Sequence, residues 1–78
     1  MRDGQGRSEE AIALLAEAVR LDPGWAAAYT NLGVVLLRAG RYEEAKGEFE
    51  TALRLAPGDP DARENLATVI DALAGAVQ

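Results

Sequence analysis

The sequence predicts an all-α fold, a stack of antiparallel helices joined by short turns. Three observations support this prediction. Ala and Leu dominate the composition, whereas the β-branched residues that favour strands are few. Apolar residues recur three or four positions apart, as they do on one face of a helix. The sequence also matches itself after a shift of 34 residues, which indicates a repeated helix–turn–helix unit.

Identical residues at matching positions define the repeat. Gly6-Arg7 corresponds to Gly40-Arg41, and Glu9-Glu10-Ala11 corresponds to Glu43-Glu44-Ala45. The further identities are Ala18/Ala52, Arg20-Leu21/Arg54-Leu55, Pro23-Gly24/Pro57-Gly58, Ala28/Ala62, Asn31-Leu32/Asn65-Leu66 and Val35/Val69. These pairs are spread over most of the chain, so the repeat is a property of the whole fold.

The first two helices are predicted over 8–21 and 25–38. Residues 1–7 are expected to be disordered, which would put Glu9-Glu10 in the first turn of the first helix. Pro23 stops this helix because its ring cannot continue the helical hydrogen bonding. The second helix carries one apolar stripe of residues, Trp25, Tyr29, Leu32 and Leu36.

The last two helices are predicted over 42–55 and 60–75, with Gly40 separating the second helix from the third. Glu43-Glu44 in a first turn and Arg54 in a last turn complement the helix dipole. Asp59 stands at an N-cap position, and Pro60 stands at the first helical position, where its missing N–H costs nothing.

Composition argues against catalysis and against several classes of partner. The 78 residues include no Cys and no His, so we expect no enzyme activity, no cofactor and no metal site. A net charge of −5 disfavours binding to nucleic acid and to anionic membranes. No apolar run approaches the roughly 20 residues of a membrane span, so we expect a cytoplasmic protein.

The period and the order of small, large and turn residues resemble the tetratricopeptide repeat (TPR), in which each repeat is a first (A) and a second (B) helix. The residues that carry the resemblance are Tyr29, Leu32, Gly33, Leu36, Gly40, Tyr42, Ala45, Phe49, Ala52, Leu55 and Pro57. The resemblance implies a half repeat over 8–25, a full repeat over 26–59 and a half repeat over 60–78. The expected fold is therefore a short TPR-like α-solenoid of four helices in B-A-B-A order within one domain, 8–78.

The resemblance also implies that the A helices line a concave face that binds a peptide. The residues expected there are Ala27, Thr30, Asn31, Val34, Leu37, Arg38, Asp61, Glu64, Asn65, Thr68, Asp71 and Ala72. Asn31 and Asn65 resemble the family's asparagine that hydrogen-bonds the peptide backbone. Asp61 and Asn65 stand where the family's carboxylate clamp needs basic residues, so we expect a basic or neutral protein or peptide partner. The alternative for each of these residues is an ordinary solvated helix surface.

A rival hypothesis gives the chain no separate ligand. It would then be a homo-oligomerisation element or a fragment of a longer TPR solenoid. The first helix lacks an A partner, and its broad apolar surface comprises Ala11, Ile12, Leu14, Leu15, Ala18, Val19 and Leu21. The last helix lacks a B partner, and its apolar residues are Leu66, Val69, Ile70, Leu73 and Val77. A homodimer through helices 8–21 and 60–75 would cover both surfaces.

Overall fold

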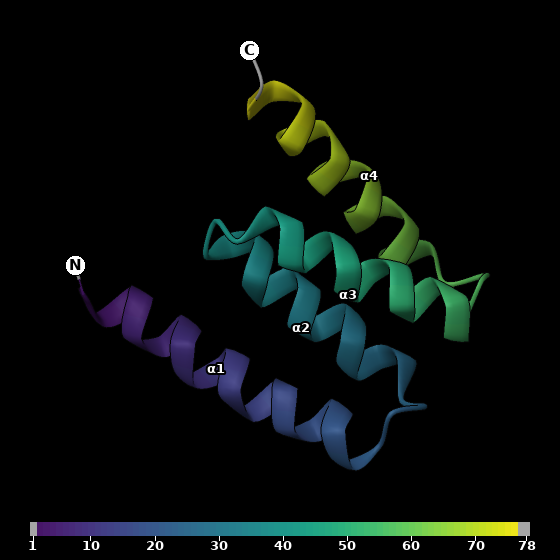
Figure 1. The fold of residues 1–78 in the computed structure, drawn as a ribbon, viewed down its shortest axis with the longest axis horizontal. Helices are drawn as coiled ribbons and strands as arrows, with labels where there is room; N and C mark the ends of the chain where they lie inside the picture. Colours follow the sequence, from purple (N-terminus) through teal and green to yellow (C-terminus); the bar gives the residue numbers. More distant parts are fainter. Residues whose placement is uncertain (1, 77–78) are drawn as a thin grey trace.

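The computed structural model describes the backbone of residues 2–76 and the side chains of residues 6–75. Its helices are α1 (Arg2–Leu21), α2 (Ala26–Arg38), α3 (Tyr42–Leu55) and α4 (Pro60–Ala76). Successive helices run antiparallel and lie side by side in a flat stack of 33 × 29 × 15 Å (Figure 1). The predicted all-α class is confirmed, because the described residues contain no strand.

The helix boundaries agree closely with the prediction at three of the helices and differ at the first. The helices α3 and α4 begin at the predicted residues, and α2 begins one residue late because Trp25 is its N-cap. The helix α1 begins at Arg2, so the expectation of disorder is wrong for residues 2–7. Residues 1, 77 and 78, including Val77, lie outside the described part.

The early start of α1 has a physical reason. Gly4 and Gly6 weaken a helix, but the stretch 2–7 contains no proline to stop one. Extending an existing helix adds a hydrogen bond for each residue without the cost of nucleation. Glu9-Glu10 consequently lies in the interior of α1 and not in its first turn, which corrects a second expectation.

The turn between α2 and α3 is built around Gly40. Its φ of 81° is a left-handed conformation that favours glycine. The Gly40 N–H donates to the Leu37 carbonyl at 3.1 Å, and the Arg41 N–H donates to the Leu36 carbonyl at 2.9 Å. This pair of bonds is a Schellman motif, which satisfies the last carbonyls of α2 and turns the chain into α3.

The start of α4 has the N-cap that the sequence predicts. Asp59 Oδ1 accepts a hydrogen bond of 3.0 Å from the Asp61 N–H. Asp61, in the first turn, also places a negative charge near the positive end of the helix dipole. The corresponding residue before α2 is Trp25, which makes no side-chain cap.

The core lies mainly between α2 and α3, which make the most extensive helix–helix contact. The fully buried apolar residues are Ala28, Leu32, Leu36, Ala45, Phe49, Ala52, Ala62 and Val69. Ala45 and Ala52 are fully buried small residues, and the fully buried Phe49 packs closely on Gly33. The side chains of α1 pack against this core from one side, and none of those described is fully buried.

Candidate functional site

The predicted binding residues lie on α2 and α4, two helices that contact each other across the stack. Those that are exposed are Ala27, Asn31, Arg38, Asp61, Glu64, Thr68 and Asp71. Those that are half-buried are Val34, Leu37, Asn65 and Ala72. The remaining residue, Thr30, is buried. We call the eleven exposed and half-buried residues the α2–α4 surface.

Thr30 is left out of this surface because only 8% of it is exposed. Its hydroxyl donates to the Ala26 carbonyl one helical turn earlier, at 3.4 Å. The hydroxyl is therefore satisfied within the helix and has little access to a ligand.

Burial differs between repeat-equivalent positions of α2 and α4. On α2, Thr30 is buried and Leu37 is half-buried, whereas their equivalents on α4, Glu64 and Asp71, are exposed. The helix α2 contacts α1, α3 and α4, whereas α4 contacts only α2 and α3 among the described residues, so α4 lacks a neighbour that covers α2.

The opposite side shows the reverse pattern. Asn65 and Ala72 of α4 are half-buried, whereas their equivalents on α2, Asn31 and Arg38, are exposed. The side of α4 that carries Asn65 therefore faces α2. Asn65 is thus more enclosed than Asn31, although the two residues occupy the same repeat position.

The α2–α4 surface is predominantly acidic on α4. Asp61, Glu64 and Asp71 are all exposed there, and Arg38 is its one basic residue. The hydroxyl of Thr68 donates to the Glu64 carbonyl at 3.1 Å, so it too is used within its own helix. The groups left for a ligand are carboxylates, amides and small apolar side chains.

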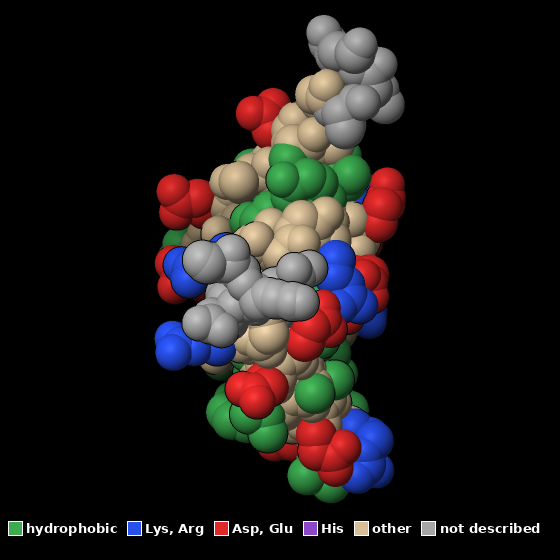
Figure 2. Space-filling view, turned by 90° about the vertical axis from the view of Figure 1, so that its left-hand side faces the viewer, with side chains coloured by type: hydrophobic (Ala, Val, Ile, Leu, Met, Phe, Trp, Pro, Cys, Tyr) green, Lys and Arg blue, Asp and Glu red, His purple; other side chains and the backbone are tan. Residues whose placement is uncertain are grey.

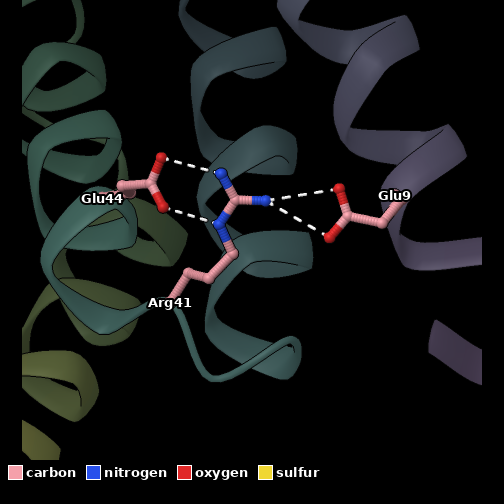
Figure 3. A network of polar contacts seen from close by, with 3 residues as sticks. All are labelled: Glu9, Arg41 and Glu44. Atoms are coloured by element: carbon pink, nitrogen blue, oxygen red, sulfur yellow. Dashed lines mark hydrogen bonds and ion pairs between the residues drawn. The ribbon is translucent and has the colours of Figure 1, made fainter.

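A polar network outside this surface joins three parts of the chain (Figure 3). Arg41, in the turn before α3, donates from Nε and Nη2 to the two oxygens of Glu44 at 2.6 and 2.9 Å. Its Nη1 reaches both oxygens of Glu9 on α1, at 3.5 and 3.4 Å. The bond from Arg41 lowers the pKa of Glu44. Arg41 therefore ties α1 to α3, which the sequence analysis did not anticipate.

Glu48 is the described carboxyl whose pKa is raised. Its partial burial on α3 is the main cause of the raised pKa, and the negative charge of Glu44 raises it further. A raised carboxyl pKa can mark an acid catalyst, but such a group needs reactive partners. Among the described residues, no cluster of three Asp or Glu side chains is placed to hold a metal ion.

Apolar side chains that are not part of the α2–α4 surface are also exposed. The large exposed ones are Leu14, Leu21, Trp25, Leu55 and Ile70. Figure 2 shows an apolar patch below the C-terminal end of the chain, with charged side chains on both sides of it.

The family to which these helices belong is decided by a sequence comparison. A family model described as tetratricopeptide repeat matches residues 2–60 and again residues 30–73. The chain belongs to the tetratricopeptide repeat family. TPR repeats generally mediate protein–protein interactions and are typically non-catalytic. No curated protein matches the TPR chain significantly. Within the described residues, none of its helices has the length and apolar character to cross a membrane.

Proposed function

We propose that this TPR chain binds a peptide segment of a partner protein on the α2–α4 surface, and that the peptide is basic or neutral. The observation that carries the proposal is the exposure of Asp61, Glu64 and Asp71 together on α4. Three carboxylates beside a single Arg38 would attract lysine and arginine side chains and repel an acidic peptide.

Two asparagines supply the groups that an extended backbone requires. Asn31 and Asn65 occupy equivalent positions of the two repeats, one exposed and one half-buried. A side-chain amide offers both a donor and an acceptor, so each can pair with a peptide N–H and C=O. Val34, half-buried between the polar positions, would contact an apolar side chain of the ligand.

The dimensions of the surface limit the length and affinity of the ligand. The 13 residues of α2 span about 20 Å at 1.5 Å per residue. An extended peptide advances about 3.3 Å per residue, so roughly six residues fit along the helix. The area that the two helices offer is about half of what each partner buries in a standard interface, so we expect micromolar or weaker binding.

Fluorescence anisotropy with two labelled peptides tests the proposal. One peptide alternates Lys with Ala over six residues, and the other alternates Glu with Ala. We expect the Lys peptide alone to bind at low salt, and its affinity to fall as salt screens the carboxylates. Protein concentrations are kept where sedimentation gives the monomer mass, so that any self-association does not interfere.

A charge-reversal variant and a matched control locate the site. Asp61→Lys with Glu64→Lys should weaken binding of the Lys peptide about tenfold or more. Glu43→Lys with Glu50→Lys makes the same change in net charge on exposed positions of α3 and should have a much smaller effect. Equal losses in both variants, or no loss in the first, would place binding elsewhere.

A further inference from the structure

The two end helices leave uncovered the positions that are buried in the middle of the chain. Leu36 of α2 is 3% exposed, but its repeat equivalent on α4, Ile70, is 46% exposed. Phe49 of α3 is fully buried, but its equivalent on α1, Leu15, is only half-buried. The outer face of α4 thus resembles the face of α2 that α3 covers, but within the described residues it has no such cover. The outer face of α1 likewise resembles the face of α3 that α2 covers.

We propose that copies of this chain assemble head to tail, with α4 of one copy packing on α1 of the next as α2 packs on α3. The proposed contact goes beyond peptide binding, although Glu64, Asp71 and Arg38 belong both to it and to the α2–α4 surface. It commits to a second copy of the chain because size, charge and helix length at the two ends are complementary.

The residues that would meet in the assembly are complementary in size. Within the chain, Phe49 packs so closely on Gly33 that a Cβ there would lie 2.5 Å from the ring. The equivalent pair at the ends is Ala67 and Leu15. In this pair, α4 has the Cβ of Ala67 in place of glycine, and α1 has Leu15, which is smaller than phenylalanine. Ala67 is exposed within one copy, so α1 of another copy can reach it.

An ion pair joins the two B helices of the chain, and its repeat equivalents are left unpaired among the described residues. Arg41 contacts Glu9 of α1 at 3.4 Å. The repeat equivalents are Arg7 and Glu43, which are exposed and form no ion pair within residues 6–75. In a head-to-tail assembly, Arg7 of one copy would take toward Glu43 of its neighbour the place that Arg41 takes toward Glu9.

Exposed charges on α2 and α4 are also complementary. Thr30 and Leu37 lie on a covered side of α2, and their equivalents on α4 are the exposed Glu64 and Asp71. The side of α4 that faces α2 corresponds to the exposed Asn31 and Arg38 on α2. Assembly would bring the two carboxylates of one copy to Arg38 of the next, a favourable juxtaposition of opposite charges.

Helix lengths agree with the same arrangement. The helix α4 continues to Ala76, past the equivalent of the C-terminus of α2, and α1 begins at Arg2, before the equivalent of the N-terminus of α3. Both extensions lie at the same end of the proposed pair.

Sedimentation velocity over about 10 to 500 µM tests the assembly, because mass action favours larger species at higher concentration. A contact between two different faces leaves one face unpaired at each end of an open assembly, so the average mass should rise past two copies. A constant mass of 8.3 kDa would overturn the proposal. A species that stops at two copies would overturn the head-to-tail form.

A single charge in the proposed contact provides the control. Ala67→Glu is at an exposed position, so the monomer should fold, and the dissociation constant should rise about tenfold or more because a charge would be buried. Ala16→Glu is at an exposed position whose equivalent on α3 is already Glu50, and it should not change assembly. Equal behaviour of the two variants would contradict the proposed contact.

Size complementation provides the most specific test. Leu15→Phe should weaken assembly because its ring would meet the Cβ of Ala67 in the next copy. Adding Ala67→Gly should restore assembly, since the double variant recreates the Gly33–Phe49 pair between copies. Circular dichroism of the diluted variants checks that each folds. Failure of Ala67→Gly to improve assembly of the folded Leu15→Phe protein would overturn this docking geometry.

Discussion

The ring of Phe49 lies against the backbone of Gly33 with no room for a side chain. A Cβ added to Gly33 would lie 2.5 Å from Cε1 and 2.7 Å from Cδ1 of the ring, well inside the 3.0 Å approached by real Cβ atoms. Phe49 itself is fully buried, so its ring cannot move out into solvent. The glycine is therefore required by packing between α2 and α3.

Gly33→Ala should lower the free energy of unfolding by about 1–3 kcal/mol, because overpacking outweighs the better helix propensity of alanine. Gly47→Ala is the matched control on α3, where nothing lies within 4 Å of the added Cβ. It should raise the free energy of unfolding by about 0.5–1 kcal/mol. Urea denaturation measures both, and equal stabilisation by the two changes would refute the packing requirement.

Phe49→Leu should partly relieve the clash in the Gly33→Ala protein. The double variant is then expected to be more stable than the sum of the two single changes predicts, by about 0.5–3 kcal/mol. A double-mutant cycle on denaturation midpoints gives this coupling. Strict additivity would mean that the two positions do not interact.

Asp59→Ala should remove the N-cap of α4 and lower the free energy of unfolding by about 1 kcal/mol. Asp59→Asn keeps an oxygen that can accept the bond from the Asp61 N–H, so it should cost much less. Thermal denaturation of the two variants distinguishes capping from a simple loss of charge. The prediction fails if Asn is as harmful as Ala.

Glu48→Gln should stabilise the protein at neutral pH. Burial raises the pKa of Glu48, so the folded chain binds this proton more readily than the unfolded chain and ionised Glu48 lowers stability. Solvent screens a half-exposed group, so the gain should be roughly a few tenths of a kcal/mol. It should shrink as the pH falls through the raised pKa and vanish below the ordinary carboxyl pKa, and Glu10→Gln at an exposed position should show no such gain.

Arg41→Met should loosen the attachment of α1 to α3 by removing the contacts with Glu9 and Glu44. The thermal midpoint should fall at low salt, and the difference from the wild type should shrink at high salt. The lowered pKa of Glu44 predicts a pH dependence as well. The stabilisation of the folded chain by the Arg41–Glu44 pair is present above the ordinary carboxyl pKa and is lost as the pH falls through the lowered pKa. Arg54→Met, at an exposed position, controls for the loss of one positive charge.

The turns and the core between the helices could be predicted from the sequence because their signals are local. Gly40, Asp59 and Pro60 each act within a few residues of their own position, and the structure confirms the boundaries that they predict. Phe49 and Ala45 are placed by the helical period and by the repeat, and both are fully buried.

The features that the sequence did not disclose depend on neighbours distant along the chain. Thr30 looks like a polar surface residue, but it is buried once the helices are stacked. The contact between Arg41 and Glu9 crosses from the α3 end to α1 and is visible only once the helices are stacked. The start of α1 was missed because glycine signals a weak helix and cannot by itself signal where the helix ends.

The concentration of fully buried side chains in α2, α3 and α4 divides the chain by how readily its backbone opens to solvent. Amide protons in the middle of α2 and α3 become accessible only when Phe49 and Leu36 leave their places, which requires global unfolding. Among the described side chains of α1, none is fully buried, so its amides can exchange through detachment of that helix alone. We therefore expect the two-helix hairpin at the centre to open last, after α1 has detached.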